Sequence, residues 1–318
     1  MDLQYSSQDL TLTLQDYSER ILAPAVNNLA AVVAANVMSG AESICNYVSK
    51  LNGSAVDTPT ANEWLLAGAY LDQNSAPRGR RRAILDPLTQ ARTVSSLAGL
   101  FNPTGTVSKQ FTSGEMMGPA LGIEQWAMDQ TVLKHTTGAY STLGTVSGAS
   151  QTGSSITTSA LAGPLKKGDI ITFAGVNAVN RLTKNSVGQL RQFVVTADVA
   201  GGATSIPIYP ALIPGPSVQY QTVDVSPASG AAITVVSQAS EVYRKNFVLR
   251  PEAVTLATAD LVMPKGVHDA GRESYDGISM RMVSQYNVST DQFITRLDIL
   301  YGWQWVRPEW ACVVADKL

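Results

Sequence analysis

The densest group of side chains that could bind an anion is an arginine run in the first third of the chain. Arg78, Arg80, Arg81 and Arg82 follow Pro77 within five residues. Guanidinium forks bind carboxylates on a neighbouring protein copy as well as they bind phosphates. A solvated loop explains such a run equally well, and four arginines make a duplex-binding surface only if many copies lie side by side. We predict these four arginines as intersubunit-contact candidates.

The tripeptide Arg-Pro-Glu occurs twice, at 250–252 and at 307–309. In an extended chain the arginine and the glutamate of each copy point to the same side. The proline between them cannot donate to a strand ladder, so we predict both tripeptides at sheet edges or bulges. Fixed charges at such positions could set the register between subunits, although two surface loops explain them nearly as well. The candidate contact residues are Arg250, Glu252, Arg307 and Glu309.

Residues that could catalyse a reaction are few. The chain has two histidines, His135 and His268, and it contains no HExxH, GxSxG or CxxC motif. His135 is interpreted as a residue at the boundary of an uncharged segment. His268 stands next to Asp269, so a catalytic dyad and a hydrolase function form a minor hypothesis. We predict that the protein is not an enzyme, with no catalytic residue, no cofactor and no metal site.

The composition limits the possible partners. Charged residues make up 15% of the 318 residues, the formal net charge is −2, and the two cysteines are too few for a disulfide scaffold. A near-neutral chain gives no reason to expect tight binding to nucleic acid. No apolar run approaches the roughly 18 residues of a membrane-spanning helix. We therefore expect synthesis in a cytoplasm and no membrane contact.

A long amphipathic helix is predicted near the start of the chain. Asp16 and Glu19 resemble a capping box, and Pro24 should kink the helix or restart it. Apolar residues then recur at spacings of three and four, which predicts a helix up to about Ser49 that ends before Gly53. The members of this stripe are Val26, Leu29, Val33, Val37, Ala41, Ile44, Val48 and Leu51.

The rest of the chain predicts a mixed layer interrupted by a β-module. Shorter helices are predicted over 60–70 and 87–100, with a strand in the segment RRAILDP between them. Residues 136–165 carry no charged side chain, and the short β-branched runs DIITFAG, RQFVVTA, TSIPIYP, YQTVDV and AAITVVS follow. Such runs indicate a small barrel or sandwich at about 140–240. Beyond it, two long strands joined near 289–291 are predicted.

The chain ends in a tryptophan-rich segment, LYGWQWVRPEWACVV. Termini normally fray unless something holds them in place. Three tryptophans, Trp303, Trp305 and Trp310, lie within eight residues there. We therefore predict that this end is a strand docked on a large core.

These parts, in this order, resemble the major capsid proteins of tailed phages. The most specific pieces are KKGDIITFAGV within the β-module and YGWQWVRPE near the end, and the resemblance runs from about residue 14 to the C-terminus. More narrowly, the chain resembles the P22-type coat proteins of short-tailed phages, in which an insertion domain interrupts the shell-forming domain.

The resemblance implies an α+β, HK97-type capsid fold with a spine helix, a peripheral domain, an axial domain and an inserted small β-barrel. Residues 1–54 would form the N-terminal segment and spine helix of the peripheral domain, and 55–139 the first part of the axial domain. Residues 140–240 would form the inserted barrel, and 241–318 the return to the axial domain and the peripheral strands.

The implied function is a structural coat subunit that self-assembles into hexamers and pentamers of an icosahedral head around double-stranded DNA. Implied partners are other copies of the chain, scaffolding and portal proteins, and DNA through weak non-specific contacts, with the virion capsid as location. Family members carry an N-terminal arm and an extended loop before the spine helix, whereas about 15 residues precede it here. In the family, both segments reach across to neighbouring subunits. Here the arm and loop would therefore have been removed by truncation or processing, or the interlocking contacts would be made by other parts of the chain. The alternative hypothesis is a β-rich adhesin or tail-associated binding protein.

Overall fold

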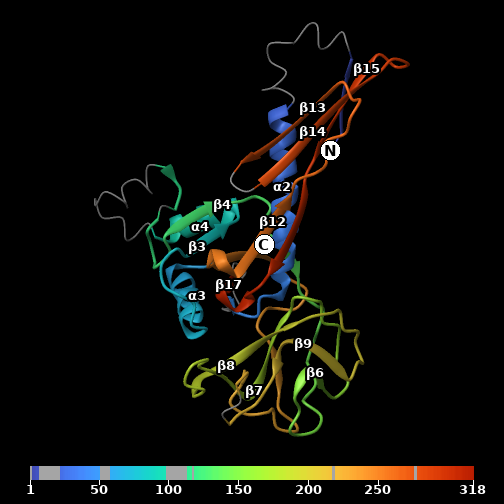
Figure 1. Cartoon of the computed structure of the whole chain (residues 1–318). Coiled ribbons are helices and arrows are strands. Elements are labelled where there is room, and N and C mark those ends of the chain that lie inside the picture. Colours follow the sequence, from blue (N-terminus) through green and yellow to red (C-terminus); the bar gives the residue numbers. More distant parts are fainter. Residues whose placement is uncertain are drawn as a thin grey trace. The chain divides into compact units, whose positions relative to one another are not determined.

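The structure, a computed structural model, describes residues 2–6, 22–50, 58–97, 113–116, 118–216, 219–275 and 278–318 (Figure 1). The fold is of the mixed α+β kind, with mostly strands and few helices. The chain divides into two compact units. The hairpin unit contains the described residues of Met1–Met38 and Val254–Gln304, and the main unit contains those of Ser39–Ala253 and Trp305–Leu318.

The hairpin unit contains the two long strands that the sequence predicts. Strands β14 (Ile278–Asn287) and β15 (Gln292–Asp298) pair antiparallel, with the turn between them at the predicted place. Strand β13 (Asp269–Tyr275) pairs with β14, and β1 (Asp2–Ser6) pairs with β15, which gives a four-stranded sheet. Strands β12 (Val254–Ala259) and β16 (Leu300–Trp305) form a separate two-stranded sheet.

The predicted long helix is shorter than the sequence suggests. Helix α2 spans Ala23–Ser39, with the proline in its first turn as one of the two predicted alternatives requires. The prediction of a helix up to about residue 49 is wrong, because Gly40–Ser43 form a 3-10 turn and Tyr47–Val48 form strand β2. The predicted start at residue 16 lies outside the described residues.

The main unit contains a six-stranded sheet covered by two helices. Its strands run in the order β2, β17 (Ala311–Lys317), β11 (Val242–Leu249), β3 (Arg82–Leu85) and β4 (Gln125–Met128), and β5 (Lys134–Thr136) also pairs with β11. Helices α3 (Ala61–Gln73) and α4 (Pro87–Ser96) confirm the two predicted helices, and β3 confirms the strand between them. The 3-10 turns η4 (Pro251–Ala253) and η5 (Pro308–Trp310) follow β11 and precede β17.

Local sequence explains where these two helices begin. Thr60 and Glu63 form a capping box at the start of α3, in which the Glu63 side chain accepts a hydrogen bond from the backbone N–H of Thr60 at 2.7 Å. At the start of α4 the Asp86 side chain accepts from the N–H of Leu88, and Pro87 occupies the first turn. Helix α3 packs on a core that includes its own Trp64, which is fully buried.

The tryptophan-rich end of the chain is docked, as predicted. Trp305 is buried, and its ring lies 6.5 Å from that of Phe247 on β11. Trp310 packs against the core of the six-stranded sheet, and β17 lies between β2 and β11 within that sheet. Burying aromatic rings of this size contributes strongly to stability, which explains why this end of the chain does not fray.

Four of the five predicted β-branched runs form a five-stranded antiparallel sheet together with β6 (Gly153–Thr157). Its order is β10 (Ile233–Val235), β7 (Ile170–Val179), β8 (Ser186–Val195), β9 (Ser205–Leu212) and β6. A separate apolar core, with Phe173 and Phe193 at its centre, lies under these strands. Four of the five predicted runs are strands, whereas YQTVDV makes only isolated bridges, through Val223 to Ala178 and Pro214.

Candidate interaction sites

The predicted arginine run divides into buried and exposed members. Arg81 has a side chain 6% exposed, and its Nη2 lies 2.5 Å from Oδ1 of Asp72. Arg78 binds the other oxygen of Asp72 at 3.2 Å, but its side chain is 85% exposed. Partial burial would raise the pKa of Asp72, but hydrogen bonds from Arg81 and Arg78 outweigh it and lower the pKa below its ordinary value. Asp72 is therefore a carboxylate with one buried partner and one exposed partner.

This shared carboxylate allows a matched comparison. We expect Arg81→Gln to lower the free energy of unfolding by about 2 kcal/mol, because a buried charge-assisted hydrogen bond is lost. Arg78→Gln should change it by less than about 0.5 kcal/mol, because water screens the exposed pair. Urea denaturation of the two variants measures the difference, and equal losses would show that Arg81 contributes no more than a surface ion pair.

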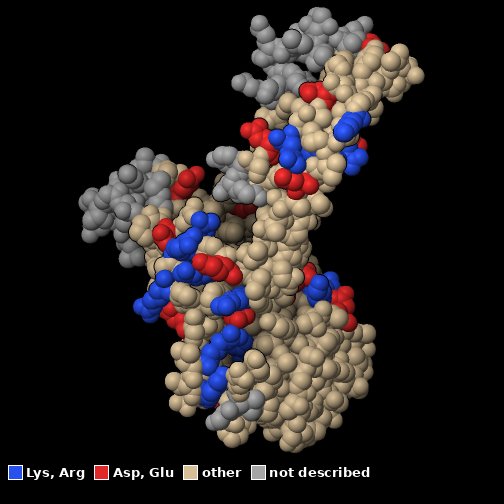
Figure 2. Space-filling view, in the orientation of Figure 1, with Lys and Arg blue, Asp and Glu red and all other residues tan. Residues whose placement is uncertain are grey.

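Arg80 and Arg82 remain accessible from solvent. The backbone N–H of Arg80 donates to the Glu124 carboxylate at 2.5 Å, and its guanidinium lies 3.9 Å from Glu252. Arg82 is exposed and has no ion pair in the described part of the chain. Both line a hollow of about 290 Å³ together with Arg81, Glu124 and Gln125. On the face that Figure 2 shows, basic and acidic side chains lie interleaved rather than gathered into one large basic patch.

The two Arg-Pro-Glu tripeptides were predicted at sheet edges or bulges. In the structure they lie instead at the turns η4 and η5. The two turns are joined by reciprocal backbone hydrogen bonds: the N–H of Arg250 donates to the carbonyl of Trp310, and the N–H of Arg307 donates to the carbonyl of Ala253, each at 3.1 Å. The prediction was wrong because a proline that cannot join a ladder can equally start a 3-10 turn.

The charged side chains of the two turns have different partners. Arg250 binds Glu252 of its own tripeptide at 2.7 Å and also donates to the Gly79 carbonyl at 2.6 Å. In the second tripeptide, Arg307 lies over the Trp310 ring at 4.3 Å, and Glu309 binds Arg181 at 2.8 Å. The predicted projection of Arg and Glu to one side thus produces an ion pair only in the first tripeptide.

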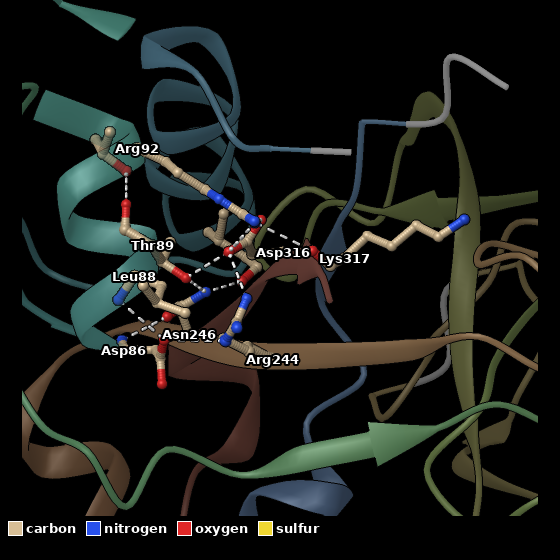
Figure 3. Close-up of polar contacts among 10 residues, drawn as sticks. Asp86, Leu88, Thr89, Arg92, Arg244, Asn246, Asp316 and Lys317 are labelled. Atoms are coloured by element: carbon tan, nitrogen blue, oxygen red, sulfur yellow. Dashed lines mark hydrogen bonds and ion pairs between the residues drawn. The ribbon is translucent and has the colours of Figure 1, made fainter. Parts of the chain in front are cut away.

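An ionic cluster around the buried carboxylate of Asp316 was not predicted from the sequence. Asp316 on β17 is completely buried, and its carboxylate receives hydrogen bonds from Arg92 of α4 at 3.0 Å and Arg244 of β11 at 3.2 Å (Figure 3). Thr89 donates to it at 2.7 Å, and Arg244 also pairs with Asp86 at 2.9 Å. Figure 3 shows the carboxylate between side chains of the helix and of the adjacent strand, so the cluster ties α4 to the sheet.

A second buried polar cluster joins β5 and β11 to the segment before β7. Nε2 of His135 lies 2.8 Å from Asp169, which is buried and also accepts from the backbone N–H groups of Gly138 and Lys166. Lys245 of β11 is buried as well, and its Nζ donates to the Gly168 carbonyl at 3.0 Å. His135 is therefore part of a structural cluster rather than a simple boundary residue.

His268, the basis of the hydrolase hypothesis, is placed differently. Its ring packs 5.4 Å from that of Phe293, and its backbone N–H donates to Gln285 at 3.2 Å. Within the described residues, no hydrogen bond joins the His268 ring to Asp269. The dyad on which the minor hydrolase hypothesis rested is thus not formed in this structure.

The described residues show neither a metal site nor a membrane-spanning helix. No group of three or more His, Cys, Asp or Glu side chains there could hold a metal ion. No described helix is both long enough and apolar enough to cross a membrane.

Comparison with known proteins identifies the class of the protein. A family model described as "P22 coat protein - gene protein 5" matches residues 2–314. Because the match covers nearly the whole chain, the chain belongs to the P22 coat protein family. The protein is therefore a major capsid protein of a tailed phage, a structural subunit that associates with copies of itself in the virion capsid. This match confirms the coat-protein hypothesis and does not support the alternative of an adhesin or tail-associated binding protein.

Solved structures similar to this chain are also of phage origin. A structure from Mycobacterium phage Che8 is 11% identical and covers 99% of this chain and 68% of that chain, with a TM-score of 0.41. The capsid structure of the cyanophage P-SCSP1u is 10% identical and covers 99% and 70%, with a TM-score of 0.46. The CUS-3 coat protein I-domain is 32% identical over 33% of this chain and 96% of that domain, with a TM-score of 0.23. A search of the curated proteins found no match.

Proposed function

We propose that this capsid protein assembles into the hexamers and pentamers of an icosahedral head that encloses double-stranded DNA. The observation that carries the proposal is the family match over residues 2–314. Each subunit of a closed shell shares several interfaces, so weak contacts add up over many copies. The near-neutral net charge of −2 suits a container, because strong attraction would hinder the movement of DNA during packaging and release.

We further propose an HK97-type arrangement for the chain. The spine helix would come from residues 1–54, and α2 is its described part. The axial domain would be formed by residues 55–139 together with the segment that directly follows residue 240. The five-stranded sheet over 140–240 would be the inserted β-barrel, which is supported by its own apolar core around Phe173 and Phe193. The remaining segment of 241–318 would supply the peripheral strands.

The exposed arginines are the best candidates for contacts between subunits. Arg82 has no ion pair in the described part of the chain, and Arg80 has only a long one, so both can receive carboxylates from another copy. Arg81 and Glu309 bind partners in their own chain and are weaker candidates. Scaffolding and portal proteins, packaged DNA and synthesis in the host cytoplasm complete the proposal.

Charge reversal tests the assembly role of the arginine run. We expect Arg82→Glu to lower the yield of closed shells about tenfold, because a carboxylate facing a carboxylate repels the neighbouring copy. Unfolding of the isolated subunit should be unchanged, since the side chain is exposed. Co-expression with the scaffolding protein, followed by gradient sedimentation and negative-stain electron microscopy, measures the yield.

The matched control for this experiment is Lys166→Glu, which reverses a second exposed and unpaired cation outside the arginine run. Normal shells from Arg82→Glu would remove Arg82 from the interface. A wild-type chain that stays monomeric under all conditions, scaffolding protein included, would contradict the proposed assembly itself.

A further inference from the structure

A hollow beside β8 is lined by three cationic side chains. Arg181, Lys184 and Arg191 contribute to its wall, together with neutral residues that include Tyr220 and Gln221. Its volume is about 420 Å³. Pockets that accept a whole side chain or a small ligand have volumes of about 300–1,000 Å³. We call this hollow the Arg191 pocket.

Arg191 is a buried cation without an ion-pair partner among the described residues. It is 9% exposed, and its Nε has no hydrogen-bond partner. Its Nη2 donates to Sγ of Cys45 at 3.7 Å, and in the part of the chain that the structure describes no carboxylate lies within ion-pair distance of it. Burial raises the pKa of the Cys45 thiol, so this neighbour is neutral and does not compensate the guanidinium.

The other two cations of the pocket leave its charge positive. Arg181 uses Glu309 as its partner at 2.8 Å. Nζ of Lys184 donates to the backbone carbonyl of Gln219 at 2.8 Å, which supplies a dipole but no negative charge. One carboxylate thus serves three cations, and the charge that remains lies on Lys184 and Arg191.

The free energy of burial predicts an anionic occupant. A buried charge without a partner costs several kcal/mol, so buried cations are normally paired with an anion. Oε1 of Gln221, in the same wall, is also buried without a hydrogen-bond partner and can accept an N–H. An occupant that offers both an oxyanion and a donor satisfies both groups, and a carboxylate side chain on a peptide segment does so.

We propose that the Arg191 pocket is an oxyanion site that receives an acidic side chain from a second copy of this chain. This occupant rests on the proposed assembly function, which brings copies into contact. Charge complementarity supports it, because the pocket wall is cationic and the chain carries exposed carboxylates. Exposed Glu115 and Glu273 have no ion pair within the described residues, so carboxylates are available on a neighbouring copy.

The first arm of the test measures the site in the unassembled full-length subunit, with inorganic phosphate as the probe. Titration at constant ionic strength, followed by calorimetry and by thermal unfolding, should show saturable binding to the wild type. Arg191→Gln should weaken binding about tenfold or more, because the only buried guanidinium of the pocket's three cations is lost. Lys184→Gln should weaken it about threefold. The control Lys166→Gln, an exposed lysine outside the pocket lining, should bind like the wild type.

The second arm measures assembly and separates the two sources of oxyanion. Saturating phosphate should slow wild-type shell formation several-fold, and Arg191→Gln should assemble equally slowly with or without phosphate. Absence of saturable phosphate binding to the wild type would overturn the oxyanion site. If Arg191→Gln does not fold, Lys184→Gln decides instead: phosphate binding by this variant as tight as that of the wild type would also overturn the site.

Phosphate binding with an unaltered assembly rate would assign the pocket to a free anion and overturn the second-copy occupant. A wild-type chain that binds phosphate but never assembles would contradict the proposed function, while the oxyanion site itself would stand. The two failures are therefore distinguishable.

Discussion

Asp316→Asn is expected to lower the free energy of unfolding by about 3 kcal/mol, the lower end of the range for breaking a buried ion pair. The Asp316 carboxylate is completely buried and compensates the guanidinium groups of Arg92 and Arg244. Without its charge, Asp86 is the one remaining carboxylate bound to Arg244, and Arg92 loses its ion-pair partner within the described residues. The buried Arg244 then keeps only one of its two carboxylates, and this partial loss of compensation in the interior is the main cost. The Arg92 side chain is 36% exposed, so water can solvate its charge and its loss of a partner costs little.

The control for Asp316→Asn is Asp260→Asn. Asp260 also pairs with an arginine, Arg272, at 3.4 Å, but its side chain is 60% exposed. We expect a change of less than about 0.5 kcal/mol there. Urea denaturation of the unassembled subunits measures both variants at neutral pH. Similar losses for Asp260→Asn and Asp316→Asn would show that burial does not decide the energetics of the cluster.

The cluster could not be predicted from the sequence, because the sequence does not show which residues of two paired strands lie opposite each other. In the structure, Arg244 and Asp316 are directly opposite partners on the paired strands β11 and β17. Cross-strand pairs of opposite charge stabilise a sheet, but the two residues are separated by 71 positions that lead through the hairpin unit. Asp316 is the third residue from the end of the sequence and follows the apolar run that predicts a docked strand, so an aspartate there is normally interpreted as the exposed end of that strand.

The secondary structure was predicted better than the contacts, and its one large error has a physical cause. Apolar residues at spacings of three and four predicted helix through Ile44 and Val48. Both residues are buried as predicted, but Val48 lies on β2 opposite Val314 of β17. Over so short a stretch, spacing reports which residues are buried and not which backbone conformation buries them. Gly40, directly after the helix, was the available signal for its end.

A signal for the second buried cluster was present in the strand that contains it. Along β11 the residues Tyr243, Lys245, Phe247 and Leu249 alternate onto one face, and a lysine on an apolar face of a strand is unusual. The partners of Lys245, which lie near Gly168 and Asp169, belong to a segment more than 70 residues earlier, so the sequence could indicate the buried lysine but not its environment.

Lys245→Met should stabilise the subunit at pH 7 and lose that advantage in alkaline solution. Burial lowers the pKa of Lys245 to about 8, although the negative charges of Glu42 and Asp169 oppose the shift. A pKa shift of one unit corresponds to about 1.4 kcal/mol. The charged form of Lys245 is thus disfavoured in the folded state by about 3 kcal/mol, relative to a lysine of ordinary pKa in the unfolded chain. Methionine avoids this penalty but leaves the Gly168 carbonyl without its donor, which costs about 1 kcal/mol. The expected gain at pH 7 is about 2 kcal/mol.

The pH dependence gives the sign of the effect. Below the folded-state pKa of about 8, Lys245 is protonated in both states and the penalty is fully present. Between about 8 and the ordinary value of 10.5, the unfolded chain binds more protons, so wild-type stability rises with pH. Above 10.5 the lysine is neutral in both states, and its hydrogen bond makes the wild type the more stable protein by about 1 kcal/mol.

Urea denaturation across this window measures the crossing. The difference between wild type and Lys245→Met should change sign as the pH rises from 7 toward about 10.5, with a total change of about 3 kcal/mol. The matched control Lys166→Met removes an exposed lysine of the same region, and it should stay within about 0.5 kcal/mol of wild type at each pH. If the difference for Lys245→Met is constant with pH, the buried ammonium is not the group that limits stability, and the cluster around Asp169 must tolerate its charge at no cost.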